Sequence, residues 1–115
     1  MDVQKLNEEE IAQKLAELEE GWEVQDDFIN KEYEFENFTE ALAFVNQIGA
    51  IAEEADHHPD IFFGYGYAEI AITSHDAGGL TERDFELAIK IDKLWVFKFK
   101  QEMNRRDAET PRKKK

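Results

Sequence analysis

The residues of this chain that could do chemistry are first of all its three histidines, two of which are adjacent. His57 and His58 stand in the stretch "EEADHHPDIFF", among carboxylic acids and directly before Pro59. Histidine titrates nearest to neutral pH, so the pair could transfer protons or bind a metal ion. The pair could also be a polar helix end, because cations are favoured beside the free carbonyls of a helix C-terminus. Their spacing alone leaves these three interpretations open.

A metal site here would combine His57 and His58 with the neighbouring carboxylates. Adjacent histidines on an extended backbone diverge, and the chain offers no His-x-x-x-His pair and no cysteine. We therefore expect no metal. The acidic neighbours that such a site would need are Glu53, Glu54, Asp56 and Asp60.

Three further candidates follow the paired histidines. His75 is expected at a strand end, where side chains often carry function, although an ordinary surface residue is the simpler interpretation. The run "AGGLTE" leads into an expected helix N-terminus and could hold an anion, but it lacks the lysine of a phosphate loop, so capping is favoured. Four aromatic side chains could stack on a flat ligand or simply pack in the core. They are Phe62, Phe63, Tyr65 and Tyr67.

Two helices are expected before the paired histidines. The first is capped by Asn7, with Glu10 at the reciprocal position, and should end at Gly21. The second is capped by Asn37, and Pro59 should stop it at or before residue 57. Its core stripe is expected to comprise Phe38, Leu42, Val45, Gly49 and Ala52, widened by Phe44, Ile48 and Ile51.

The third helix is expected to begin after Thr81 as its cap, with Asp84 at its third position. Its apolar residues continue to Met103 and occupy more than one face. A helix that is apolar on two faces is buried twice. In a chain this small, the second face predicts contact with another subunit.

Two pairs of strands complete the pattern. "WEVQDDFINKEYEF" reads as two strands around Asp26-Asp27, and "DIFFGYGYAEIAITSH" reads as a hairpin. Along the second strand, Ile29, Tyr33 and Phe35 share one face, which Lys31 interrupts. Such alternation is typical of an antiparallel sheet with one wet face. The order α-β-β-α-β-β-α, with helices on one face of the sheet, predicts an α+β sandwich.

The composition fits one soluble domain. A length of 115 residues suits a single domain, which we place at residues 1–104, with a charged, flexible tail at 105–115. The formal net charge of −13 argues against nucleic-acid binding. No apolar run is long enough for a membrane span, and the N-terminus does not resemble a signal peptide. We therefore expect a cytoplasmic protein with no nucleic-acid or membrane partner.

The spacing of the candidate residues resembles a known family signature. Glu53, three residues, His57-His58-Pro59, five residues, Tyr65, nine residues, His75, eight residues and Asp84 resemble the signature of the pterin-4a-carbinolamine dehydratases. In animals this family includes the dimerisation cofactor of a homeodomain transcription factor. The words "HHPDI" and "SHDAGGLTERDF" look like bacterial members.

The resemblance implies a fold, an activity and a set of site residues. The fold would be a four-stranded antiparallel sheet with three helices packed on one face. The activity would be that of a 4a-hydroxytetrahydrobiopterin dehydratase, a hydro-lyase that forms quinonoid dihydropterin and water and needs no cofactor or metal. The implied catalytic residues are His57, His58 and His75. The implied substrate-binding residues are His57, His58, Pro59, Ser74, His75, Asp76 and Ala77, with Glu53, Tyr65 and Asp84 in support.

Loss of the 4a-hydroxyl requires one proton delivered to the leaving oxygen and one removed from a ring nitrogen. We assign His57 and His75 as the acid/base pair and His58 as a ring-binding group, without deciding which of the pair is the acid. The implied partners are a pterin substrate, further copies in a homodimer or homotetramer, and a functional link to an aromatic amino-acid hydroxylase. The alternative is a non-catalytic oligomeric binding module or coactivator-like partner of the same fold.

Overall fold

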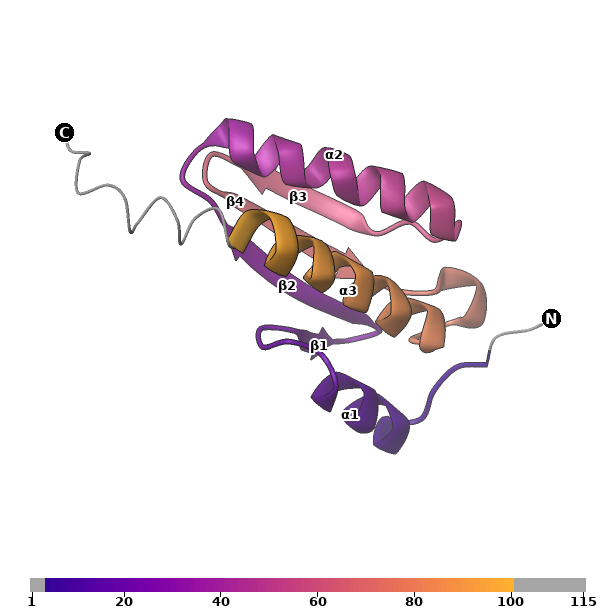
Figure 1. Ribbon diagram of the computed structural model, residues 1–115. Coiled ribbons are helices and arrows are strands. Elements are labelled where there is room, and N and C mark those ends of the chain that lie inside the picture. Colours follow the sequence, from indigo (N-terminus) through magenta and orange to yellow (C-terminus); the bar gives the residue numbers. More distant parts are fainter. Residues whose placement is uncertain (1–3, 101–115) are drawn as a thin grey trace.

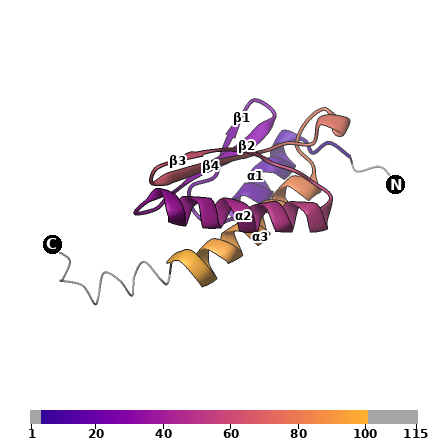
Figure 2. The ribbon, with the colours of Figure 1, turned by 90° about the horizontal axis from the view of Figure 1, so that it is seen from above.

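The computed structural model describes residues 4–100 and shows a four-stranded antiparallel sheet with its helices on one face (Figures 1 and 2). This confirms the predicted α+β class and element order. The predicted domain end at residue 104 and the charged tail at 105–115 lie outside the described residues. The elements are α1 (Glu8–Ala16), β1 (Glu23–Gln25), β2 (Phe28–Glu34), α2 (Phe38–Ala55), β3 (Asp60–Gly64), β4 (Tyr67–Ile72), the 3-10 turn η1 (His75–Ala77), α3 (Glu82–Leu94) and the π-helical turn η2 (Trp95–Lys100).

The sheet joins two hairpins through their longer strands. Its order is β1-β2-β4-β3, so the central pair is β2 with β4, and β1 and β3 form the edges. Asp26 adopts a positive φ of 56° in the turn between β1 and β2. The predicted alternation is confirmed, because Ile29, Tyr33 and Phe35 are all buried on the face that carries the helices.

The predicted helix starts are confirmed at all three caps. Asn7 and Glu10 form a reciprocal capping box at α1, and the Asn37 side chain accepts the Glu40 N–H at α2. Thr81 caps α3. These signals are local, since a cap needs only a side-chain oxygen within three residues of a free backbone N–H.

The predicted end of α1 at Gly21 is wrong, because the helix ends at Ala16. Beyond it the chain leaves the helical path, and the Glu19 backbone N–H donates to Asp92 Oδ2 at 3.3 Å. Gly21 instead takes a φ of 110° before Trp22. A contact with a distant helix therefore replaces the last predicted turn.

The predicted core stripe of α2 is also wrong in part. The helix is buried along Ala41, Phe44, Ile48 and Ala52, whereas Phe38 and Leu42 are 44% and 38% exposed. Phe38 instead stacks on Phe63 of β3, with ring centroids 5.5 Å apart. The helix carries two overlapping apolar stripes, and packing against the sheet selects one of them.

Part of the apolar surface of the last helix is buried within the chain. At Trp95 it passes into a π-helical turn, and Met103 lies outside the described residues. Leu87 and Ile91 are 1% and 0% exposed without any second subunit, and Ile11, Leu15 and Leu18 from the α1 region pack against the same core. Phe97 of η2 is nevertheless 67% exposed, so the predicted contact with another subunit stays a prediction.

Lys31, which interrupts the apolar face of β2, is paired with a buried acid. Its Nζ lies 2.9 Å from Asp92 Oδ1 of α3, and the Lys31 and Asp92 side chains are 9% and 5% exposed. Asp92 also accepts from Trp22 Nε1 at 2.8 Å and from the Tyr33 hydroxyl at 2.6 Å. Burial, together with the Asp92 charge, raises the pKa of Tyr33. This polar cluster joins α3, β2 and the segment after α1.

Candidate active site

Three elements that are distant in sequence meet at one end of the molecule. The end of α2, the end of β4 with η1, and the start of α3 lie together on the right-hand side of Figure 1. Hydrogen bonds join all three, through His57, Ser74 and Asp84. The sheet and the two helices thus bring candidate residues from three segments into one cluster.

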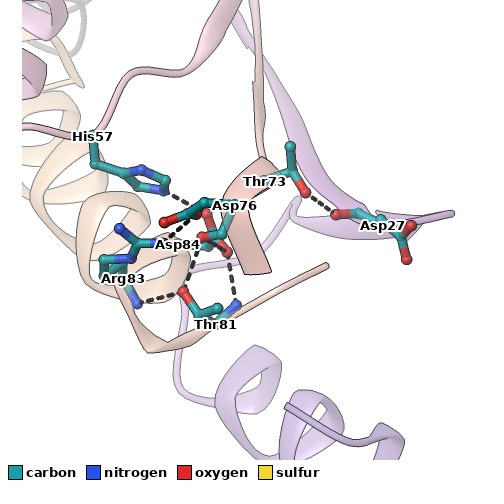
Figure 3. Close-up of polar contacts among 8 residues, drawn as sticks. Asp27, His57, Thr73, Asp76, Thr81, Arg83 and Asp84 are labelled. Carbon is teal, nitrogen blue, oxygen red and sulfur yellow. Dashed lines mark hydrogen bonds and ion pairs between the residues drawn. The ribbon is translucent and has the colours of Figure 1, made fainter. Parts of the chain in front are cut away.

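The shortest contact of this cluster joins His57 to Asp84. His57 Nε2 lies 2.6 Å from Asp84 Oδ1, across 27 residues of sequence. The Asp84 side chain is fully buried and the His57 side chain is 11% exposed. Figure 3 shows the His57 ring reaching toward Asp84 from the end of α2. A buried carboxylate therefore orients a nearly buried imidazole.

The termination of α2 sets the position of His57. Asp56 adopts the left-handed conformation, with φ 53° and ψ 43°. The His57 N–H donates to the Ala52 carbonyl at 3.1 Å and the Asp56 N–H to the Glu53 carbonyl at 3.2 Å. This pair of bonds is the Schellman ending, which satisfies carbonyls that the helix leaves free. It turns the chain so that the His57 side chain faces the start of α3.

Asp84 serves two elements at once. Its Oδ2 accepts the Thr81 backbone N–H at 2.8 Å and the Ser74 hydroxyl at 2.9 Å. The first bond completes the capping box of α3, while Oδ1 remains for His57. Asp84 therefore both caps a helix and holds a candidate catalytic histidine.

The contact with Asp84 assigns the two ring nitrogens of His57. An ionised carboxylate can only accept hydrogen bonds, so Nε2 is the donor in this pair. Nδ1 is then the ring nitrogen that does not contact Asp84. The same logic holds imidazole rings in one tautomer in enzymes that pair histidine with aspartate.

His58 has a different environment from its neighbour. Its Nε2 lies 2.6 Å from Glu53 Oε2, but the His58 and Glu53 side chains are 55% and 78% exposed. The pair lies on the surface of the last turn of α2 and has no contact with the Asp84 cluster among its hydrogen bonds. Of the adjacent histidines, His57 is held by a buried carboxylate and His58 by an exposed one.

His75 is exposed and directly follows the buried Ser74. Its ring meets Phe28 edge-on, with centroids 6.1 Å apart and an interplanar angle of 79°. Since Ser74 bonds Asp84, the backbone at His75 is held near the same cluster while its side chain stays open to a ligand.

Asp76 is paired with Arg83, a cation that the sequence interpretation did not single out. Arg83 Nη2 donates to Asp76 Oδ1 at 2.7 Å, and this hydrogen bond lowers the pKa of Asp76. The sequence did contain a signal, because Arg83 is the one arginine or lysine in "SHDAGGLTERDF". The sequence predicted Thr81 only as a helix cap and gave no signal for its hydroxyl contact with Ser74.

Tyr65 lies away from the other signature residues. It stands in the turn between β3 and β4 and is 74% exposed. The neighbouring Gly66 carbonyl accepts the Phe35 N–H at 2.8 Å, which places this turn near the start of α2 rather than its end. Pro59 and Ala77 remain at the cluster's end of the fold, next to His58 and within η1 respectively.

Within residues 4–100, no group of three His, Cys, Asp or Glu side chains is arranged to hold a metal ion. No helix in that range is long and apolar enough to cross a bilayer.

Comparison with known proteins identifies the family. The family model described as pterin 4 alpha carbinolamine dehydratase matches residues 4–94. The chain belongs to this family. The match includes every residue of the cluster, and the family-level activity is that of a dehydratase.

Similar proteins occur in distant bacteria and archaea. A provisionally named pterin-4-alpha-carbinolamine dehydratase of Rubrobacter xylanophilus is 50% identical over 86 residues, which are 74% of this chain and 80% of the relative. One of Sulfolobus acidocaldarius is 44% identical over 90 residues, covering 78% of this chain and 98% of the relative.

Solved structures of the family share the fold. A transcriptional coactivator/pterin dehydratase from Brucella melitensis superposes with a TM-score of 0.74 at 32% identity, covering 78% of this chain and 97% of the other. A pterin dehydratase-like protein described as a RuBisCO assembly factor in the alpha-carboxysome gives a TM-score of 0.53 at 26% identity, covering 64% and 84%.

Proposed function

We propose that this chain dehydrates a 4a-hydroxytetrahydropterin to the quinonoid dihydropterin and water, and so recycles a pterin cofactor. The observation that carries the proposal is the 2.6 Å contact between His57 Nε2 and Oδ1 of the fully buried Asp84. Within the dehydratase family, this cluster offers a positioned imidazole for proton transfer at neutral pH.

The reaction breaks the C4a–O bond and forms a double bond between C4a and N5. One proton reaches the leaving hydroxyl, which departs as water, and one proton leaves N5, so the atoms balance. His57, through Nδ1, and His75 are the acid/base pair. His58, exposed and held by Glu53, contacts and orients the ring. Two histidines in opposite protonation states can perform both transfers.

The test is a coupled assay. The purified protein is added to a pterin-dependent aromatic hydroxylase, and decay of the 4a-carbinolamine absorbance is followed. We expect faster decay in proportion to added protein, and a rate equal to the uncatalysed one would overturn the proposal. The rates with biopterin and with pterins that carry other ring substituents are then compared to identify the preferred substrate.

We propose that the reaction requires no metal and no bound cofactor, since acid/base groups suffice for the dehydration. Elemental analysis of protein purified without an affinity tag tests this proposal. Stoichiometric zinc, iron or nickel would contradict it. A cytoplasmic location and a partnership with a hydroxylase of the host remain predictions.

We also propose that the protein is a homodimer or homotetramer. The second copy would cover the apolar residues that the single chain leaves open beside the edge strand β3, namely Phe38, Leu42 and Phe62. Light scattering measures the mass directly, and Leu42→Glu should lower it. A monomer at micromolar concentration contradicts the proposal.

A binding role is the second candidate, because one solved neighbour is described as a RuBisCO assembly factor. A fold alone does not distinguish such a role from catalysis. The three histidines favour catalysis, since a binding module does not require them at these spacings. A stoichiometric protein partner, together with no turnover, would favour the binding role.

A further inference from the structure

Behind the His57–Asp84 pair lie two buried hydroxyl groups that the proposed chemistry does not use. Ser74 and Thr81 are 1% and 0% exposed, so neither side chain is open to a bound ligand. Ser74 Oγ lies 2.9 Å from Asp84 Oδ2 and 2.9 Å from Thr81 Oγ1. A buried hydroxyl is expensive to place without partners, and both of these are fully engaged.

The donors of this network all point toward the carboxylate. Ser74 has one hydroxyl proton, which it donates to Asp84, so Thr81 must donate the proton between the two hydroxyls. Thr81 Oγ1 in turn accepts the Arg83 backbone N–H at 3.2 Å. Hydrogen bonds in such a chain polarise and strengthen one another.

The backbone of Ser74 is fixed as well. Its carbonyl accepts the N–H groups of Ala77 and Gly79, at 3.1 and 3.3 Å. The loop that carries His75 therefore sets the position of the Ser74 hydroxyl. Figure 3 shows Thr81 and His57 on different sides of Asp84, so the network meets the carboxylate away from the histidine.

We propose that Ser74 is a positioning residue, whose hydroxyl holds Asp84 Oδ2 so that Oδ1 faces His57 and fixes the Nε2–H tautomer. Without this bond, Asp84 keeps only the Thr81 N–H at Oδ2 and can rotate about its terminal torsion. The kinetic consequence rests on the proposed dehydratase function, whereas the tautomer is a property of the protein itself.

The experiment compares three variants by nitrogen-15 NMR of the histidine rings and by dehydratase kinetics. Ser74→Ala removes the hydroxyl, and Ser74→Thr restores it. Thr73→Val is the matched control, because this neighbouring hydroxyl donates to the Asp27 carbonyl and has no bond to Asp84. Figure 3 shows Thr73 and Asp27 on the side of Asp84 away from His57. Thermal unfolding verifies that each variant is folded.

In the parent protein and in Thr73→Val we expect one dominant His57 tautomer with a downfield Nε2–H proton. In Ser74→Ala we expect mixed tautomers and loss of that proton signal. The kcat should fall about tenfold with little change in KM, a part of the 10²–10⁴ that a positioned proton-transfer group contributes. Ser74→Thr should recover the dominant tautomer with its downfield proton signal, and the kcat of the parent protein.

An unchanged His57 tautomer in folded Ser74→Ala overturns the positioning role. An inactive parent protein whose Ser74→Ala variant still loses the tautomer overturns the proposed dehydratase function and leaves the positioning role supported. If Ser74→Ala does not fold, the His57 tautomer is compared between Ser74→Thr and Ser74→Cys, which place a hydroxyl and a weaker thiol donor at position 74. The same tautomer in both variants overturns the positioning role.

Discussion

The adjacent histidines of the site stand in unequal environments. His57 is 11% exposed and held by a buried carboxylate, whereas the exposed His58 faces solvent with Glu53. The exposed ion pair contributes little, because solvent screens it and ordering two flexible side chains costs entropy. A substitution of His58 should therefore leave the fold intact, so a loss of activity would report on the role of the side chain itself. A substitution of His57 also removes a nearly buried contact and so affects the fold.

At the residue scale, His75→Ala should keep the fold and lose most of the dehydratase activity. The side chain is exposed and contacts only Phe28 among the ring contacts of the described chain, so the stability change should stay within about 0.5 kcal/mol. Steady-state kinetics and thermal unfolding measure the two effects separately. Unchanged turnover would remove His75 from the acid/base pair.

Asp76 gives a prediction about pH. The Arg83 hydrogen bond lowers the pKa of Asp76, so the stabilisation from this pair is present at neutral pH. It is lost as the pH falls through the lowered pKa. In Arg83→Gln the pKa of Asp76 should rise toward its ordinary value, about 3.9. A pH titration of the Asp76 carboxyl carbon by NMR measures this change.

Lys93→Gln is the control for this titration, because it removes one exposed positive charge from the same helix at a distance from Asp76. The pKa of Asp76 should stay low in that variant. An equal rise in both variants would show that net charge, rather than the hydrogen bond, lowers the pKa.

At this scale the sequence supported the identities of the candidate residues but not their contacts. The helix cap at Thr81 and the helix end before Pro59 follow from local rules. The bond between His57 and Asp84 joins residues 27 apart, and no local pattern specifies it. Family resemblance pointed to both residues, and only the fold shows that Asp84 combines the cap with the histidine contact.

At the element scale, both partners of the central pair lie at helix ends. Asp84 lies in the first turn of α3, and His57 directly follows the end of α2. Helix N-termini favour anions, by about 0.3–1 kcal/mol at exposed sites, which suits the Asp84 carboxylate. The start of α3 therefore stabilises the acid of the pair through its backbone N–H groups.

The ending of α2 gives an element-scale prediction. Asp56 holds a left-handed φ of 53°, which glycine adopts freely and β-branched residues resist. Asp56→Val should lower the free energy of unfolding by about 1–2 kcal/mol and reduce turnover, because it displaces His57. Asp56→Gly should keep both properties near the parent values. Urea unfolding and steady-state kinetics test the pair of variants.

Equal behaviour of the valine and glycine variants would show that the helix ending does not position His57. Valine and glycine remove the same carboxylate, so any difference between the two variants reports on backbone conformation rather than on charge.

The errors of the sequence interpretation also belong to this scale. The chosen stripe of α2 included Phe38 and Leu42, which are exposed, because a helix with two apolar stripes has no local rule for choosing between them. The predicted end of α1 was wrong for a similar reason, because the Glu19 N–H donates to Asp92, which lies far along the chain.

At the scale of the whole molecule, the cluster around Asp92 joins the N-terminal segment, the sheet and α3. Asp92→Asn should lower the free energy of unfolding by about 3 kcal/mol, because Lys31 is then buried without a counter-charge. Dehydratase turnover at 25 °C should stay near the parent value. Asp84 and Asp92 are eight positions apart, which is about 12 Å along the helix, so the variant should leave the active site intact.

Chemical denaturation measures the loss, and Glu86→Gln is the matched control, since Glu86 is an exposed acid on the same helix. Its effect should stay within about 0.5 kcal/mol. If Asp92→Asn lowers the free energy of unfolding no more than Glu86→Gln does, the cluster does not stabilise the fold.

The placement of both buried carboxylates on α3 restricts how this helix can dock. Asp84 must meet His57 and Ser74 at one end, while Asp92 must meet Lys31 and Tyr33 at the other. If α3 shifted along its axis by one helical turn, about 5.4 Å, apolar residues could still pack against the sheet. Both buried acids would then lose their hydrogen-bond donors. Apolar contacts tolerate alternative alignments, whereas these two acids accept one. The helix is thus located along its axis by two polar reference points, and the assembly of the active site follows from that alignment.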